Sequence, residues 1–264
     1  MLGTGAAMVT KCYNTCFTLS DETGEHFLVD GGGGNGLLVQ LEKAGIKPHA
    51  IHHAFISHNH SDHILGLVWL VRAVTQEINK GRYIGDLTIY GHRHSLDALR
   101  AICTFVMQTK LSAHFGQRVK FQEITDGDSL EILSRKVEFF DIGSRKELQY
   151  GFMLTLHSGR KLAFMGDEPI HDCMRERLQG VNIIMQEAYC LYADREVFNP
   201  YPKSHGTVVD SCRNARDLGA DTTILFHTEG RSLPTRKARY TAEAKTIFNG
   251  KIYVPEDLEV IDLE

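Results

Sequence analysis

Short apolar runs rich in β-branched and aromatic residues alternate along the chain with longer segments whose apolar residues recur every three or four positions. The short runs predict eight strands, over residues 26–30, 54–57, 86–90, 137–142, 152–157, 162–165, 183–185 and 223–226. The helical spacing predicts five helices, over residues 37–44, 64–78, 96–107, 208–218 and 235–248. Strands and helices that alternate in this way are typical of an α/β fold.

Nothing in the sequence marks an internal boundary. The 264 residues contain no repeat, no low-complexity tract and only six prolines, so we expect a single domain over residues 1–264. The longest apolar stretch, Ile64 to Val74, is too short to span a bilayer and is broken by Arg72. The first residues lack the basic region that opens a secretory signal. We therefore expect a cytoplasmic protein with no membrane contact.

The cysteines and the net charge bear on the redox state of the thiols and on how a nucleic acid could bind. Six cysteines, at positions 12, 16, 103, 173, 190 and 212, show neither a disulfide-rich density nor the Cys-x-x-Cys spacing of a structural zinc site, which favours reduced thiols. Cys12 and Cys16 are either a metal pair or buried, incidental thiols. The formal net charge of −4 means that a long nucleic acid would have to be held by a local basic patch.

Ionisable side chains directly follow four of the predicted strands. His58 follows residues 54–57, and Asp167, Glu187 and His227 follow the strands that end near residues 165, 185 and 226. Burying an unpaired charge is costly, so an ionisable group at the end of each strand suggests a purpose. Four such strand ends can converge on one site.

The segment that starts at His58 has the composition of a metal site. His58 and His60 can point the same way from an extended turn, and Asp62 and His63 begin the next helix. Imidazole and carboxylate groups are the ligands that hold zinc or another borderline divalent ion in hydrolytic sites. A single histidine here would more often be structural, but four donors at this spacing favour metal binding.

The motif His58-x-His60-x-Asp62-His63 resembles the signature of the metallo-β-lactamase superfamily. Further segments resemble its ribonuclease Z branch: residues 2–7, 28–33, 63–67, 166–167, 187–188 and 204–207. The resemblance covers nearly the whole chain. It implies an αββα four-layer sandwich of two mixed β-sheets flanked by helices, with two divalent metal ions along one edge and a homodimeric assembly. Zinc is the expected metal, with manganese or iron(II) as alternatives.

The resemblance also implies a role for each metal donor. His58 and His60 would hold the first ion, Asp62 and His63 the second. Asp167 would bridge the two ions, and His227 would complete the second site. Asp62 is thus both a ligand and part of the catalytic group. Metals in such a site make water a nucleophile at neutral pH.

A general acid is implied as well. His205 would protonate the leaving oxygen, and Glu187 would orient it, since a carboxylate that accepts one ring N–H fixes the tautomer of the ring. The alternative is that His205 caps the helix that begins near Gly206 and that Glu187 is merely solvated. Asp30 is either a partner of a ligand histidine or a turn residue in a glycine run.

One ligand of the family pattern is absent. Where the family supplies a further histidine to the first metal, this chain has Asp141-Ile142-Gly143-Ser144, and either Asp141 or Gly143 takes the histidine's place. Asp141 as an oxygen ligand would favour a harder ion such as manganese or iron. With Gly143 there instead, the first site would be short of a ligand and its occupancy doubtful. His157 and His171 lie nearby in sequence, but neither is at the motif position.

The expected activity is that of a phosphodiesterase resembling ribonuclease Z, an endoribonuclease of the transfer RNA 3′-processing type. Only twenty-five residues separate Asp141 from Asp167, too few for the arm with which that branch grips RNA. Short RNA ends, cyclic nucleotides or another small diester fit equally well. A thioester or lactone hydrolase would have less use for the His205 and Glu187 pair. A binding or sensing protein with an incomplete first metal site is the remaining alternative.

Two further features have more than one interpretation. A basic stretch after His227, made of Arg231, Arg236, Lys237 and Arg239, is either a solvated helix face or a phosphate contact. The glycines at 3, 5 and 31–34 lack the Gly-Lys-Ser/Thr ending of a phosphate loop. They predict tight turns beneath the metal site.

Overall fold

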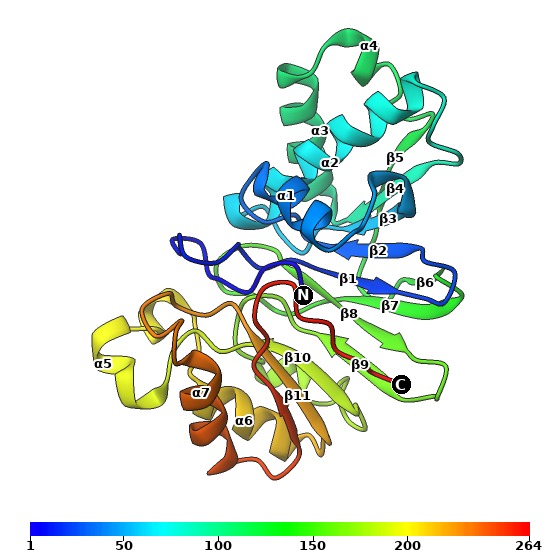
Figure 1. Ribbon diagram of the computed structural model, residues 1–264. Coiled ribbons are helices and arrows are strands. Elements are labelled where there is room, and N and C mark those ends of the chain that lie inside the picture. Colours follow the sequence, from blue (N-terminus) through cyan, green and yellow to red (C-terminus); the bar gives the residue numbers. More distant parts are fainter.

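Two β-sheets lie face to face in the computed structural model, which describes residues 1–264 (Figure 1). The first sheet has the strand order β1-β2-β3-β4-β5 and the second the order β12-β11-β10-β9-β8-β7-β6. The first contains β1 (Phe17–Ser20), β2 (His26–Val29), β3 (Ile51–Phe55), β4 (Leu87–Gly91) and β5 (Val119–Glu123). The second contains β6 (Ser129–Ile132), β7 (Arg135–Asp141), β8 (Tyr150–Thr155), β9 (Lys161–Phe164), β10 (Ile183–Glu187), β11 (Thr222–Phe226) and β12 (Lys251–Tyr253).

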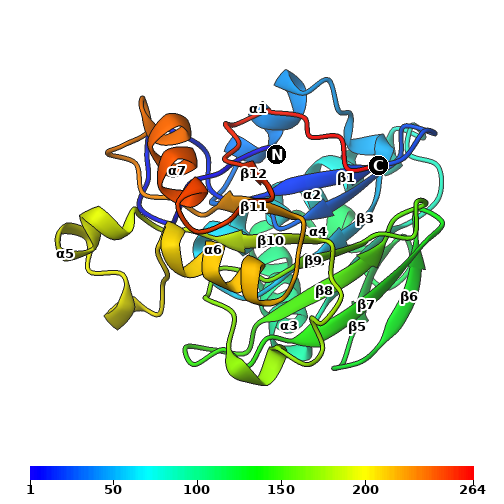
Figure 2. The same cartoon turned by 90° about the horizontal axis from the view of Figure 1, so that it is seen from below.

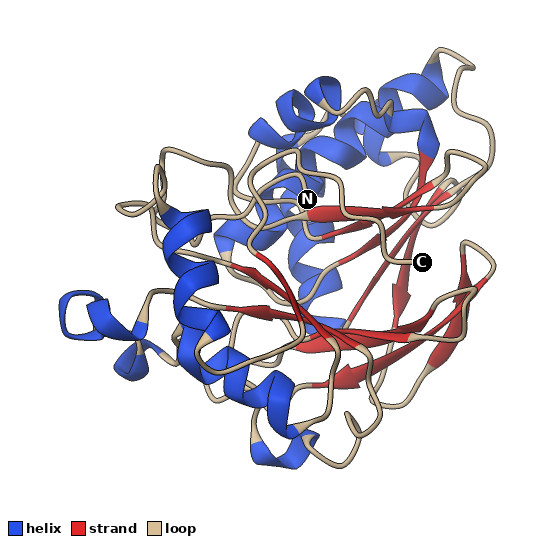
Figure 3. Cartoon of the chain, turned by 60° about the horizontal axis from the view of Figure 1, so that its bottom comes forward, coloured by secondary structure: helices blue, strands red, loops and turns tan.

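Helices cover the outer side of each sheet, as Figure 3 shows. Above the first sheet lie α1 (Gly36–Lys43), α2 (Ser61–Asn79), α3 (Arg93–Val106) and α4 (Thr109–Ser112). The second sheet is covered by α6 (Val208–Asp217) and α7 (Arg236–Lys245), seen from below in Figure 2, with the short α5 (Arg195–Phe198) beyond them. Four 3-10 turns complete the list, at Pro48–Ala50, Asp172–Met174, Tyr192–Asp194 and Tyr201–Lys203. The expected αββα sandwich of two mixed sheets is confirmed.

The alternation of side chains along each strand explains why the layers stack. In β2, Phe27 and Val29 enter the core between the two sheets, whereas Leu28 joins the core under the α1–α4 layer. The core between the sheets is aromatic and includes Phe55, Phe152 and other rings. A third core lies between the second sheet and α6 and α7. Each sheet thus buries both faces, as parallel sheets generally do.

Most strands near the centre of each sheet run parallel, so their carboxyl ends lie at the same edge of the sheet. β2 to β5 are parallel in the first sheet, and β9 to β12 are parallel in the second. The antiparallel pairs are β1 with β2 and the series β6 to β9. Ligands bind in open α/β sheets outside the carboxyl ends of the strands.

All eight predicted strands and all five predicted helices are present, with ends that differ by a few residues. The sequence pattern missed β1, β5, β6 and β12, together with the four-residue helices α4 and α5. The four missed strands are the edges of the two sheets. An edge strand has one unpaired side and fewer buried positions, so its apolar pattern is weaker.

The glycines of the 31–34 turn allow a close backbone contact beneath the site. A Cβ on Gly66 in α2 would lie 1.7 Å from the carbonyl oxygen of Gly31, and a Cβ on Gly31 would lie 2.4 Å from Leu67 N. Gly31 N donates to His63 O, and Gly66 N donates to Gly32 O. The turn after β2 is therefore fixed directly on the first turns of α2, as the tight-turn prediction required.

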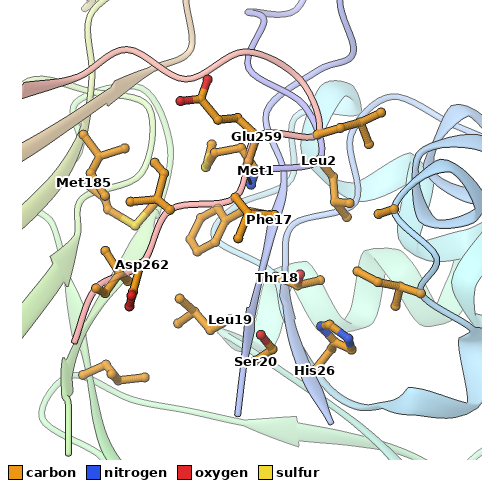
Figure 4. A pocket seen from close by; sticks show the side chains of 18 of the residues that line it. Met1, Leu2, Phe17, Thr18, Leu19, Ser20, His26, Met185, Glu259 and Asp262 are labelled. Carbon is orange, nitrogen blue, oxygen red and sulfur yellow. Dashed lines mark hydrogen bonds between the residues drawn. The ribbon is translucent and has the colours of Figure 1, made fainter. Parts of the chain in front are cut away.

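A cavity of about 640 Å³ lies between β1 and the chain's final residues, away from these strand ends. Figure 4 shows its lining, which includes Met1, Phe17, Met185 and Glu259. No predicted ligand or catalytic residue contributes to this lining.

Among the helices, none combines the length and the apolar character needed to cross a membrane.

Candidate metal centre

Six of the seven predicted donors, all except Asp141, lie in segments that directly follow the carboxyl ends of parallel strands. His58 and His60 follow β3, and Asp62 and His63 form the first turn of α2. The other two donors come from the second sheet, with Asp167 just after β9 and His227 just after β11. The chain reverses sharply at His227, which has a φ of 56°. Residues far apart in sequence thus meet at one edge of the sandwich.

One group of donors contains Asp62, His63 and His227, and Asp167 lies beside its two histidines; all four residues are buried. Asp167 Oδ2 is its centre, because it lies 3.9 Å from His63 Nε2 and 3.6 Å from His227 Nε2. Asp62 Oδ2 lies 3.4 Å from His63 Nε2. We call these four residues the four-donor group.

A second group contains His58, His60 and Asp167. His58 Nε2 lies 2.8 Å from His60 Nδ1 and 3.7 Å from Asp167 Oδ2. His58 is fully buried, whereas His60 is half-buried. We call these residues the three-donor group. It shares Asp167 with the four-donor group, so this carboxylate is placed where a bridging ligand would be needed.

Buried partners orient the ligand rings. Asp30 accepts hydrogen bonds from Ser57 N and Ser57 Oγ at 2.8 and 2.7 Å, and its Oδ2 lies 2.7 Å from His63 Nδ1. His58 Nδ1 lies 2.9 Å from Ser57 Oγ. Thr15 Oγ1 is 3.2 Å from His227 Nδ1. Each ring is held by one nitrogen, so the other nitrogen faces the donor group, as in metal sites whose outer partners fix the tautomer.

The electrostatics of the site favour a bound cation. Burial lowers the pKa of His58 well below its usual value and that of His227 to about 3, so both rings are neutral and offer a lone pair. Burial opposes ionisation of Asp62 and Asp167, but the neighbouring histidines outweigh it and hold both pKa values below the usual range. Burial likewise opposes a charged His63, yet Asp30 and Asp62 raise its pKa well above normal.

The residues present fit a divalent metal ion. His63 Nε2 is buried and has no hydrogen-bond partner, although such atoms are normally satisfied in folded proteins. It points at the oxygens of Asp62 and Asp167. Two imidazoles and two carboxylates are a donor set that suits zinc and neighbouring transition metals.

His205 and Glu187 form a pair beside the four-donor group. Glu187 is the last residue of β10, and His205 lies in the loop before α6. His205 Nδ1 is 2.7 Å from Glu187 Oε2, which leaves its Nε2 free. His205 also groups with Asp167 and His227. The helix cap that was the alternative role belongs to Thr207, whose side chain accepts from Asp210 N.

Asp141 is not brought to the donors, which removes it from the ligand set. Its carboxylate caps its own loop, with Oδ1 accepting from Gly143 N at 2.8 Å, and it lines a surface hollow with Cys173 and Arg177. Gly143 packs against Cys173. It has a φ of 72°, and a Cβ there would lie 2.6 Å from Cys173 Sγ. A side chain at position 143 would therefore meet Cys173 and be strained by the positive φ.

The other two nearby histidines lie outside the donor groups. The ring of His171 bonds Glu168, and the backbone nitrogen of His157 donates to Glu264. Cys12 and Cys16 form no metal group, and all six cysteines are free thiols.

Two residues of the loop after Asp141 reach the site, and the sequence pattern gave no sign of them. Gln149 Nε2 donates to Asp167 Oδ1 at 2.5 Å and lies 2.9 Å from His58 Nδ1. Lys146 Nζ lies 3.9 Å from Asp167 Oδ2. The run Arg145-Lys146-Glu147 was a visible cluster of charge, but its direction depends on how the loop folds.

Three of the four residues in the basic stretch are already paired. Arg236 is buried and donates to Thr4, Thr228 and Pro255, whereas Lys237 pairs with Glu259 and Arg239 with Asp194. The guanidinium of Arg231 instead lies 5.6 Å from the ring centre of Phe198. Arg231 is thus the member of the stretch that remains available to a ligand.

Comparison with known proteins agrees with this architecture. The family model described as "Beta-lactamase superfamily domain" matches residues 26–228. A protein named ribonuclease Z from Thermococcus sibiricus is 25% identical over 311 aligned positions, covering 99% of this chain and 95% of that protein.

Two solved structures show the same fold. The metallo-beta-lactamase fold protein YhfI from Bacillus subtilis superposes with a TM-score of 0.76 at 17% identity, covering 97% of this chain and 95% of that one. A diphosphatase from the PhnP family gives a TM-score of 0.73 at 18% identity, covering 100% and 96%. The family match over most of the chain, together with the donor geometry, identifies the chain as a member of the metallo-β-lactamase superfamily of metal-binding hydrolases.

Proposed function

We propose that this chain is a metal-dependent phosphodiesterase of the ribonuclease Z type. The observation that carries the proposal is the pair His205 and Glu187 beside the metal donors. His205 Nδ1 is held by a buried carboxylate at 2.7 Å, and its Nε2 is free to give a proton. A phosphodiester that leaves as an alkoxide benefits from such an acid, whereas a thioester or lactone needs it less.

The roles follow from the geometry. Asp62, His63, Asp167 and His227 would hold a divalent ion, zinc foremost. The three-donor group shares Asp167 with these residues and offers an ion fewer and less buried donors. When bound, the metal supplies Lewis acidity, which makes water a nucleophile at neutral pH and offsets the charge that develops on phosphorus.

The chain's own residues would supply the proton, orient the ligand rings and exclude water. His205 donates the proton of Nε2 to the leaving oxygen, while Glu187 holds Nδ1 and stabilises the charged ring beforehand. Asp30 keeps Nε2 of His63 turned to the donors through its hydrogen bond to Nδ1. The buried rings around Asp167 exclude bulk water, which strengthens these interactions.

The test compares two leaving groups. p-Nitrophenolate leaves without protonation, whereas a ribose oxygen needs a proton. We expect His205→Ala to lower kcat on a short RNA by about 10²- to 10⁴-fold and to affect bis(p-nitrophenyl) phosphate much less. His157→Ala, in an exposed turn, is the matched control. Equal losses on both substrates would remove His205 as the acid, and no metal-dependent turnover of either would refute the proposal.

RNA is the proposed substrate class, with small diesters as the second candidate. The relatives named ribonuclease Z support RNA, and Arg231 and Lys203 lie over the rings of Phe198 and Tyr189. Tyr189 in turn stacks on His205 with ring centres 4.9 Å apart. These cations could contact the phosphates of a short RNA, and Arg231→Ala should raise KM for RNA with little change in kcat.

The short connection before Asp167 favours the small-diester candidate. Residues 142–166 form β8, β9 and their turns, and no arm extends from them. The alignment with the Thermococcus relative is longer than this chain, so parts of that protein have no counterpart here. Relative kcat/KM for a transfer RNA precursor, a dinucleotide and a cyclic nucleotide would separate the two candidates.

We also propose a homodimer and a cytoplasmic location. Phe105 and Val106, at the end of α3, are 87% and 59% exposed. Exposed apolar side chains of this kind suit a surface that a second copy of the chain covers. The six free thiols suit a reducing compartment. Light scattering on wild type and Phe105→Glu tests the first proposal, because only a dimer built on this surface would dissociate. Cell fractionation tests the second.

A further inference from the structure

The loop between β7 and β8 is firmly attached to the metal centre. Glu168 is buried and accepts hydrogen bonds from Ser144 Oγ at 2.7 Å and from Arg145 N at 3.4 Å. Glu147 Oε1 accepts from Asn59 N at 2.8 Å, inside the segment that carries the histidine ligands. Gln149 closes the loop through two hydrogen bonds to Asp167. The side chains of this loop therefore hold defined positions relative to the donors.

That loop directs the ammonium group of Lys146 into the centre. Lys146 Nζ lies 3.9 Å from Asp167 Oδ2 and 3.9 Å from Glu168 Oε1, with 23% of its side chain exposed. Asp167 Oδ2 is the same oxygen that His58, His63 and His227 surround. The charge of Lys146 contributes to the low pKa of Asp167 and counteracts the rise in the pKa of His205.

The two donor groups differ in what they offer a cation. The four-donor group is wholly buried, whereas the three-donor group has one donor fewer and includes the half-buried His60. Lys146 lies beside Asp167 Oδ2, the oxygen that both groups share. A lysine ammonium has three N–H donors and no lone pair, so it cannot ligate a metal. Its positive charge also opposes a second cation on the same carboxylate oxygen.

We propose that the charge of Lys146 replaces that of a metal ion in the three-donor group. The chain would then hold a single ion tightly, in the four-donor group. The Lys146 ammonium supplies the second positive charge, and both Lys146 and His205 lie beside Asp167. There it would hold a non-bridging phosphoryl oxygen of the substrate. This last role rests on the proposed phosphodiesterase function, whereas the metal count does not.

The test counts metal ions without using a substrate. Wild type, Lys146→Met and Lys146→Arg are loaded with zinc or manganese, freed of loose metal by gel filtration, and analysed by mass spectrometry and by calorimetric titration. We expect one tight ion in wild type and in Lys146→Arg. Lys146→Met should bind a second ion at least about tenfold more tightly than wild type does, because the repelling charge is gone. Lys237→Met removes a lysine charge at a surface ion pair and should leave the count at one.

Two results would overturn the proposal: two ions of similar affinity in wild type, or an unchanged second affinity in Lys146→Met. If Lys146→Met does not fold, Lys146→Gln gives the same comparison. A chain that binds one ion but cleaves no diester would refute the proposed function and leave the metal count standing. In an active chain, added metal should restore diester turnover to Lys146→Met, because an ion can then take the position of the ammonium.

Discussion

His205 Nδ1 lies 2.7 Å from Glu187 Oε2, and Gly206 N donates to the other carboxylate oxygen of Glu187. Burial raises the pKa of Glu187 to about 7. Burial would lower the pKa of His205, but Glu187 outweighs it and raises that pKa. His205 therefore keeps its proton to a higher pH than a free imidazole does.

The first prediction concerns the pH profile of Glu187→Gln. A general acid works below its pKa, and activity falls as the pH rises through it. Removing the negative charge lowers the pKa of His205, so the alkaline limb of kcat/KM should move to lower pH. The profile is measured on an RNA substrate, with exposed Glu196→Gln as the control. An alkaline limb that stays in place would show that Glu187 does not tune His205.

The second prediction concerns Asp30, which holds His63 and Ser57 but is not itself a donor to the metal groups. Asp30→Asn should weaken metal affinity by about 10- to 100-fold, as loss of such a supporting carboxylate typically does. Competition with a metallochromic chelator measures the affinity. Asp21→Asn changes a turn carboxylate elsewhere on the chain and should have no effect. Unchanged affinity in Asp30→Asn would mean that backbone packing alone orients His63.

The third prediction links metal to stability. An ion bound only to the folded chain stabilises it by about 4 kcal/mol when its free concentration is a thousandfold above Kd. Dialysis against a chelator should therefore lower Tm by on the order of 10 °C, and zinc should restore it. Differential scanning fluorimetry follows both steps. The double variant His63→Ala and His227→Ala should lose the response, and an apo protein as stable as the loaded one would argue against ion binding in the four-donor group.

The fourth prediction tests the contact between α2 and the turn after β2. Gly66→Ala would place a methyl group on the carbonyl of Gly31, so the helix and the turn must separate. We expect a loss of about 3 kcal/mol or more in the free energy of unfolding, measured by urea denaturation. Arg72→Ala, at a partly exposed position of the same helix, should cost far less. A loss below about 0.5 kcal/mol would show that the chain relaxes around the methyl group.

The sequence predicted the interior of the fold better than its margins. Central strands such as β10 and β11 are buried along their whole length, so their runs of apolar residues stand out. β5, at a sheet edge, has one buried residue and three exposed ones, and β12 has only three residues. Their pairing depends on neighbours that a local pattern does not contain.

The site, too, was predictable only in part. Donors in the His58 to His63 motif and at strand ends were predictable, since strand direction fixes where those side chains lie. The β7–β8 loop was not. Asp141 ends β7 and bonds its own loop, whereas the loop after it is held by Glu168 and Glu147 so that Lys146 lies beside Asp167.

The glycine contact beneath the site has a kinetic consequence. Because Gly31 and Gly66 meet backbone to backbone, the turn that carries Asp30 and the helix that carries Asp62 and His63 move as one body. The four-donor group is then already assembled before an ion arrives, and binding of the ion requires little rearrangement of the protein. We therefore expect reloading of the apo chain to be limited by dehydration of the ion and by its path inward.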